Sequence, residues 1–240
     1  MVTIPRIIHD QLSGLIVLFT SSLWGDGLTN SKTKPFRSPI PFVNMVIHDD
    51  RSLRIGDKVT KGKGSRAKIM HKACDLSCRF IAKELGGSGL CNQSRPLNHY
   101  ANKAAKWYKN PELYPALKLD KFQLRCTVWG DLSRLSAHVL AQILPIVEGA
   151  SLRLGYVSGW RTPEMEPFKG LLQASVGNTT EAIEAHDQGW SPYGTFDRHA
   201  FRAYTGLPVY KCPYGPETIK GCSDCEIRCD GNRAVTLRAN

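Results

Sequence analysis

The fold class is decided by the stretch Phe122-Gln123-Leu124-Arg125-Cys126-Thr127-Val128-Trp129-Gly130-Asp131. Its apolar side chains alternate up to Trp129, which is the period-two pattern of a strand, and Gly130-Asp131 predicts a turn. Ser133 is a candidate cap for a helix that follows and ends around Pro145. The apolar face predicted for this helix includes Leu135, Val139, Leu140 and Ile143.

The same order of elements continues toward the C-terminus. Strands are predicted over residues 152–157 and 171–176, and Asn178 or Thr179 can cap a helix that runs through His186. Strand–helix–strand alternation predicts parallel pairing with right-handed crossovers. We therefore expect an α/β fold in one domain over residues 1–240: a partial TIM-barrel-like parallel sheet with flanking helices and a Cys-rich C-terminal loop.

Polar residues follow three of the predicted strands. In a parallel sheet the chemistry gathers at the carboxyl ends of the strands, so Asp131, Arg161 and Asn178 are candidates for lining one pocket. Asp131 has a structural alternative as a helix cap. For Arg161 the sequence indicates no local structural role, so it is the preferred contact for an anion.

Four cysteines near the C-terminus, Cys212, Cys222, Cys225 and Cys229, lie within eighteen residues in the spacing C-x9-C-x2-C-x3-C. The prolines and glycines between them predict a loop that a metal can shape. Four thiolates suit either a [4Fe-4S] cluster or a tetrahedral zinc ion. The spacing is less regular than that of a zinc ribbon and favours the iron–sulfur cluster. The alternative is a pair of structural disulfides.

A second group of cysteines lies in the first half of the chain. Cys74 and Cys78 would be one turn apart on a helix and could share a metal ion. Cys91 could supply a third thiolate, with His71 or His99 as a fourth ligand. Alternatively, Cys74 and Cys78 are small residues of the core.

The chain is strongly basic, with 32 Lys and Arg against 21 Asp and Glu, a net charge of +11. Residues 51–72 hold eight Lys or Arg and one acid, a net charge of +7. Such a segment can contact nucleic-acid phosphates and release counterions, although a solvated loop has the same composition. The basic residues proposed to contact nucleic acid are Lys58, Lys61, Lys63, Arg66 and Lys68.

The apolar segments near the N-terminus predict strands. The run from Leu15 to Phe19 lies in a strand expected over residues 12–24, and a second strand is expected over residues 42–47. Neither approaches the ~20 apolar residues of a membrane span, and no cleavage site typical of a signal peptide follows. We therefore expect no membrane association and a cytoplasmic location in a bacterial host, where eight cysteines favour metal binding over disulfides.

Several short motifs resemble the phage protein family known as gene product eighty-eight. They are Asn30-Ser31-Lys32-Thr33, Val128-Trp129-Gly130-Asp131, Leu172-Gln173-Ala174-Ser175-Val176, Gly189-Trp190 and the cysteine cluster. This resemblance implies a phage- or plasmid-type protein.

A more remote similarity is to radical S-adenosylmethionine enzymes, whose cluster motif is C-x3-C-x2-C. Cys74, Cys78 and Phe80 match this motif, but Ile81 stands where the third cysteine belongs, and Cys91 would have to replace it.

Three hypotheses of function follow. The first is a metal-cluster protein that binds or acts on nucleic acid. The second is a radical-SAM-like or redox enzyme that uses the cluster. The third is a structural zinc-binding assembly protein.

Overall fold

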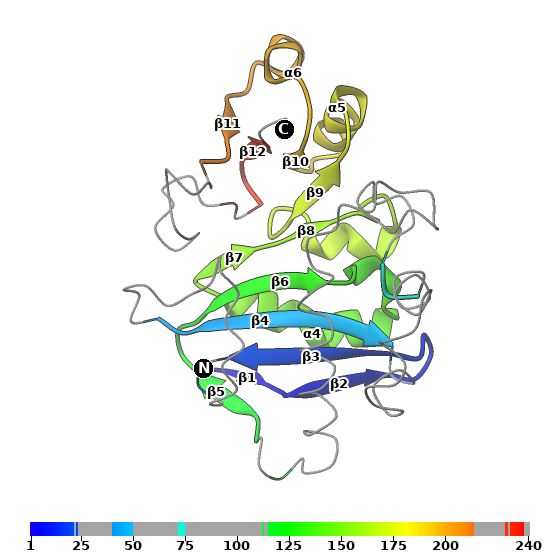
Figure 1. Ribbon diagram of the computed structural model, residues 1–240, viewed down its shortest axis with the longest axis vertical. Coiled ribbons are helices and arrows are strands. Elements are labelled where there is room, and N and C mark those ends of the chain that lie inside the picture. Colours follow the sequence, from blue (N-terminus) through cyan, green and yellow to red (C-terminus); the bar gives the residue numbers. More distant parts are fainter. Residues whose placement is uncertain are drawn as a thin grey trace, which may run out of the picture.

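A computed structural model of the chain describes residues 1–21, 23, 40–49, 72–74, 112, 115–213, 229 and 231–237 (Figure 1). The cysteines Cys78, Cys91, Cys222 and Cys225 lie outside the described residues, as do all five basic residues proposed to contact nucleic acid.

The first five-stranded sheet has the order β2-β3-β4-β6-β7. Its strands are β2 (Ile7–Asp10), β3 (Leu15–Ser21), β4 (Phe42–Asp49), β6 (Gln123–Trp129) and β7 (Leu152–Leu154). The pairs β2–β3 and β3–β4 are antiparallel, whereas β4–β6 and β6–β7 are parallel. Beside this sheet, β1 (Val2–Ile4) pairs with β5 (Leu117–Leu119) in an antiparallel ribbon.

The second five-stranded sheet has the order β11-β12-β10-β9-β8, and all its pairs are parallel. Its strands are β8 (Tyr156–Val157), β9 (Gln173–Val176), β10 (Pro192–Gly194), β11 (Val209–Lys211) and β12 (Ala234–Thr236). Only Gly155 separates β7 from β8, so one stretch of chain joins the two sheets. A side chain at Gly155 would place its Cβ 2.5 Å from Cβ of Cys126, which explains why glycine stands at this junction.

Helices connect the parallel strands. They are η4 (Leu132–Arg134), α4 (Ala137–Gly149), η5 (Pro163–Phe168), α5 (Thr179–Asp187) and α6 (Arg198–Thr205). Figure 1 shows α4 on one face of the first sheet and α5 and α6 beside the second. None of the helices in the described part of the chain is long and apolar enough to cross a bilayer.

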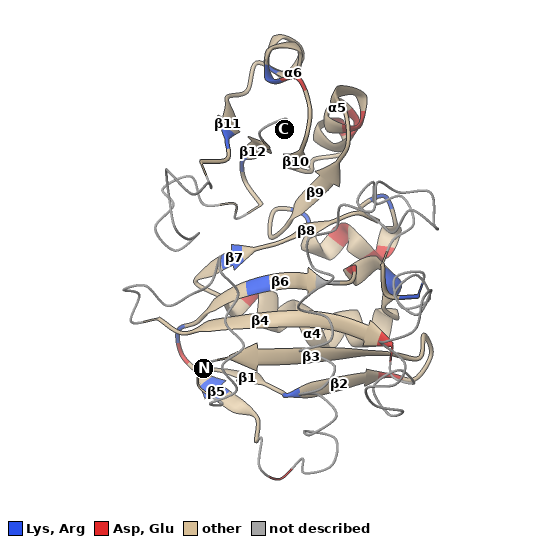
Figure 2. Cartoon of the chain, in the orientation of Figure 1, with Lys and Arg blue, Asp and Glu red and all other residues tan. Residues whose placement is uncertain are grey.

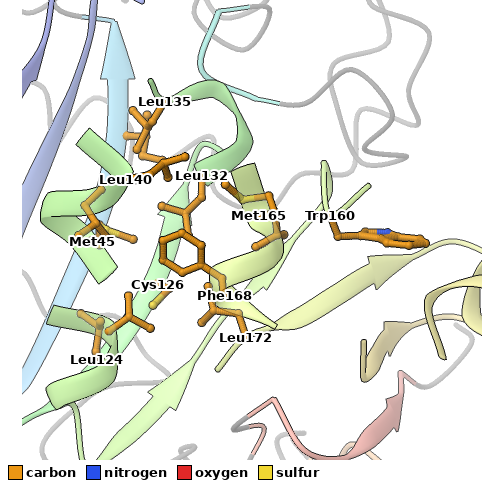
Figure 3. Close-up of a cluster of buried hydrophobic side chains, with 14 of the residues drawn as sticks. Met45, Leu124, Cys126, Leu132, Leu135, Leu140, Trp160, Met165, Phe168 and Leu172 are labelled. Carbon is orange, nitrogen blue, oxygen red and sulfur yellow. The ribbon is translucent and has the colours of Figure 1, made fainter. Parts of the chain in front are cut away.

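The core lies between α4 and the sheet face that it covers, and it continues into the second sheet, where Ala174 and Val176 of β9 pack with Ala182 and Ala185 of α5. Figure 3 shows Met45, Leu124 and Cys126 of the strands pointing toward Leu140 and Phe168. Burial raises the pKa of the Cys126 thiol to about 12, so this cysteine is a core residue and not a metal ligand.

The α/β class with parallel pairing and flanking helices is confirmed, but the described strands do not close into a barrel. The sequence order is broken where β12 inserts between β10 and β11. In the first sheet, the antiparallel β2–β3 hairpin forms the edge next to β4, and its chain turns at Gly14, which has φ 65°. A hairpin of this kind needs only a tight turn, whereas a parallel barrel strand would need a crossover.

The predicted end of the helix at Pro145 was wrong, because α4 continues to Gly149. Proline removes one helical hydrogen bond and costs about 3 kcal/mol inside a helix. The apolar face, however, continues beyond Pro145 with Ile146 and Val147, both of which are buried in the core. Burial of each such side chain contributes about 1.5–3 kcal/mol, so the two together offset the cost of the proline.

Candidate functional site

Asp131 is a buried carboxylate that follows β6 of the first sheet and hydrogen-bonds to the residue that follows β8 of the second sheet. One oxygen, Oδ1, accepts hydrogen bonds from the backbone N–H of Ser133 (3.0 Å) and from its hydroxyl (2.7 Å). The other, Oδ2, accepts from the backbone N–H of Ser158 (2.6 Å), which follows β8. The residue is 4% exposed. The predicted alternative of a helix cap is therefore confirmed, with η4 as the capped helix.

Replacing Asp131 by Ala is expected to destabilise the protein by about 3 kcal/mol, because three hydrogen bonds to a charged group are lost and the partly buried N–H of Ser158 loses this acceptor. Asp131→Asn keeps one acceptor oxygen, so we expect it to lose about half as much. Urea unfolding followed by circular dichroism measures both. An Asp131→Ala variant as stable as the native chain would contradict this structural role.

Arg161 has a structural partner that its sequence context did not indicate. Its guanidinium donates two hydrogen bonds to Glu184 of α5, from Nε to Oε1 (2.7 Å) and from Nη2 to Oε2 (2.5 Å). It also lies 4.0 Å from the ring centroid of Trp160. Arg161 therefore has a structural role, but not a local one, because Glu184 lies 23 residues away in sequence. Its contact with an anion stays a prediction.

The Arg161–Glu184 pair is expected to contribute only about 0.5–1 kcal/mol, because both side chains are 40% exposed. The double-mutant cycle of Arg161→Ala and Glu184→Ala measures this coupling. The hydrogen bonds from Arg161 lower the pKa of Glu184. The coupling is therefore complete above the unfolded pKa of Glu184 and disappears as pH falls through its lower folded pKa. A coupling independent of acid pH would contradict this assignment.

Asn178 caps α5, as predicted. Its side-chain oxygen accepts from the backbone N–H of Glu181 (2.9 Å), and the Glu181 carboxylate accepts in return from the N–H of Gly177 (2.6 Å). This reciprocal arrangement resembles a capping box. Asp131, Arg161 and Asn178 thus each have a structural role at the carboxyl ends of β6, β8 and β9, and their shared pocket remains a prediction.

The described cysteines lie on two parts of the fold. Cys212 follows β11 and donates its backbone N–H to the carbonyl of Thr236 in β12 (2.9 Å). Cys229 precedes β12, which is the neighbour of β11 in the sheet. The first and last cysteines of the cluster therefore stand on chain segments that enter and leave adjacent strands. Both side chains are half-buried.

Cys74 lies at the carboxyl edge of the first sheet. The carbonyl of the preceding residue, Ala73, accepts a hydrogen bond from the N–H of Asp131 (2.8 Å), and Lys72 forms an ion pair with Asp49 at the end of β4 (2.6 Å). The structure thus places Cys74 where the parallel strands β4 and β6 end. Within the described residues, His, Cys, Asp and Glu form no group of three that could hold a metal ion.

A set of buried polar residues was not predicted as functional. They lie on the face of the first sheet opposite α4, which we call the polar face: Thr20, Asn44, His48, Gln123 and Arg125. Their alternation with apolar residues was visible in the sequence, but this pattern is also typical of a strand whose polar side meets solvent. Only the structure shows that this side is buried.

Comparison of the chain with family models, with curated proteins and with solved structures finds no match. The function is therefore inferred from the geometry and the chemistry of the residues.

Proposed function

We propose that the chain is a phage- or plasmid-type metal-cluster protein, with a [4Fe-4S] cluster held by Cys212, Cys222, Cys225 and Cys229, and that it binds or acts on nucleic acid. The observation that carries the metal centre is the position of Cys212 and Cys229 at the two ends of the connection between β11 and β12. Parallel neighbours cannot be joined by a tight turn, so β11 and β12 need a long connecting segment, and all four cysteines fall within it.

A metal centre in this connection would act as a cross-link. The spacing supplies four thiolates, which is the donor set of a [4Fe-4S] cluster or of structural zinc. Thiolates bound to a metal would tie this segment to the strands on either side of it, which would restrict the unfolded chain as a disulfide does. The cluster in this proposal stabilises the second sheet.

The charge distribution supports a polyanionic partner. Figure 2 shows Lys and Arg interspersed with Asp and Glu on the described elements. Of the net charge of +11, residues 51–72 carry +7. A basic surplus concentrated in one segment favours binding to the phosphate backbone, because each phosphate contact releases counterions.

Titration of the anaerobically purified protein with single-stranded and duplex DNA and RNA, at two salt concentrations, tests this partner. Binding that weakens steeply with salt and depends little on sequence is expected. Absence of binding at low salt would contradict the proposed nucleic-acid partner, but it would not bear on the proposed metal centre.

A second candidate function is a radical-SAM-like or redox enzyme, and the position of Cys74 favours it. In parallel α/β folds, catalytic groups lie at the carboxyl ends of strands, and Cys74 stands beside the ends of β4 and β6. Such an enzyme would need a three-thiolate cluster from Cys74, Cys78 and Cys91, with one iron open to substrate. Electron paramagnetic resonance with and without S-adenosylmethionine tests it, and an unchanged spectrum argues against it.

A further inference from the structure

The centre of the polar face is a row of three buried side chains on neighbouring strands. In the sheet register Thr20 lies beside Asn44, and Asn44 lies beside Arg125. Their exposed fractions are 0%, 1% and 6%. Met45 and Leu124, the next residues along two of these strands, pack in the core on the α4 side. Because side chains alternate along a strand, the row points to the opposite side.

Arg125 holds a buried positive charge for which the described residues supply no counterion. Within the described part of the chain, its fully buried Nη1 has no hydrogen-bond partner and its guanidinium forms no ion pair. A buried cation is normally paired, because removal from water is otherwise unfavourable. An arginine in this position therefore indicates that an anion binds there.

Buried polar atoms of Thr20 and His48 on this face also lack a hydrogen-bond partner in the described part of the chain, and of these two only the Thr20 hydroxyl can donate to an anion. His48, on the same face of β4, has Nδ1 3.1 Å from the carbonyl of Asp49. Because a carbonyl only accepts, Nδ1 carries the proton, and the buried, unpartnered Nε2 is an acceptor. Burial lowers the pKa of His48, so the neutral ring is favoured.

An aromatic surface continues the polar face into the second sheet. Leu154 is the register partner of Arg125, and Tyr156 follows two residues later on the same face. The ring of Tyr156 stacks on that of Tyr193, with centroids 4.6 Å apart and planes within 7°. Tyr156 is 36% exposed, so this flat surface is accessible.

The backbone next to Arg125 is strained. Thr127 has φ 49°, which is unfavourable for a β-branched residue, and the register between β4 and β6 shifts at this level. Bulges and strained residues of this kind occur beside binding sites, where they redirect side chains. The strain at Thr127 is a second observation, beside the unpaired charge of Arg125, that favours a binding site here.

We propose that the polar face binds a small organic molecule through a single carboxylate. The carboxylate lies on the guanidinium of Arg125, between Thr20 and Asn44, and the planar or apolar part of the ligand contacts Tyr156. Guanidinium and carboxylate match as a bidentate pair. Arg125 is the one Lys or Arg that the described strands place on this face, and one guanidinium matches one carboxylate in charge and shape.

Benzoate, its neutral analogue benzamide, and inorganic phosphate are suitable probes. Thermal unfolding and calorimetry of the anaerobically purified protein compare them at millimolar concentration and equal ionic strength. Benzoate is expected to raise the melting temperature saturably, whereas benzamide and phosphate are not. Arg125→Gln is expected to weaken benzoate binding at least about tenfold. Arg153→Gln, which removes the same charge from the opposite face of neighbouring β7, is the matched control and retains binding.

A second readout is the stability of the unliganded protein. Removing an unpaired buried charge is expected to make Arg125→Gln more stable than the native chain without ligand. Thr20→Val preserves shape, removes the unpartnered hydroxyl, and is expected to keep the fold while weakening benzoate binding. The proposal is overturned if benzoate has no saturable effect on the melting temperature of the native chain. It is also overturned if Arg125→Gln and Thr20→Val both bind benzoate as tightly as the native chain does. It is also overturned if phosphate matches benzoate.

Discussion

Replacing Cys225 by Ser is expected to remove most of the bound metal and to lower the melting temperature. A four-thiolate centre that loses one ligand no longer closes the loop between Cys212 and Cys229. By analogy with a cross-link that closes a loop of this length, the loss is about 3 kcal/mol. For a chain of this size, such a loss corresponds to a decrease of about 6–12 °C in the melting temperature.

The matched control for this experiment is Cys126→Ala. Cys126 is also a cysteine of the second half of the chain, but it is buried in the core. This variant is expected to lose some stability through a small cavity and to keep all of the metal. Metal content is measured by elemental analysis of anaerobically purified protein, and stability by thermal unfolding. Equal metal content in Cys225→Ser and the native chain would contradict the four-thiolate centre.

Replacing the five basic residues Lys58, Lys61, Lys63, Arg66 and Lys68 by Gln is expected to weaken nucleic-acid binding at least about 100-fold at ~0.1 M salt. Each phosphate contact that is lost also reduces the salt dependence, by about 0.9 in the logarithmic slope for duplex DNA. Fluorescence anisotropy with labelled single-stranded and duplex DNA, measured over a range of salt, gives both quantities.

The control for this variant removes the same charge from other exposed positions. Gln replaces five residues of the described surface: Lys118, Lys121, Arg198, Arg202 and Lys211. If residues 51–72 form the contact, this control is expected to lose much less affinity than the first variant. Equal losses in the two variants would show that net charge alone governs binding, and would contradict a specific role for the basic segment.

The long apolar strands and the helices between them could be predicted from the sequence. The apolar patterns predicted β3, β4, β6 and β9, the helical periodicity predicted α4, and the cap at Asn178 predicted α5. The predicted cap at Ser133 was wrong, because Ser133 lies within η4 and α4 begins after Ser136. The parallel pairing followed from the alternation of strands and helices. These elements were predictable because each buries a continuous pattern of apolar side chains.

The short elements of the second sheet could not be predicted. The strands β10, β11 and β12 have three residues each, which is too short for a period-two pattern to appear. In β10, Pro192 and Gly194 suggest a turn. The structure shows that Gly194 lies against the backbone of Val176, where a side chain would not fit. The strand thus depends on a tertiary contact.

The side chains of the candidate sites show the same limit. The sequence could place Asp131 and Asn178 at caps, because their partners are two or three residues away. It could not pair Arg161 with Glu184. Nor could it show that the side of β6 bearing Arg125 is buried, because alternation indicates which residues share a face and not what covers that face.

The most direct test of the account is the iron and sulfide content of the anaerobically purified native chain. The account predicts four iron and four sulfide ions at the C-terminal thiolates, retained in Cys78→Ser and lost in Cys222→Ser. If the protein contains stoichiometric zinc and no iron, the four cysteines form a structural zinc site and not an iron–sulfur cluster. Absence of both metals, with Cys212, Cys222, Cys225 and Cys229 joined in disulfides, would contradict the central claim.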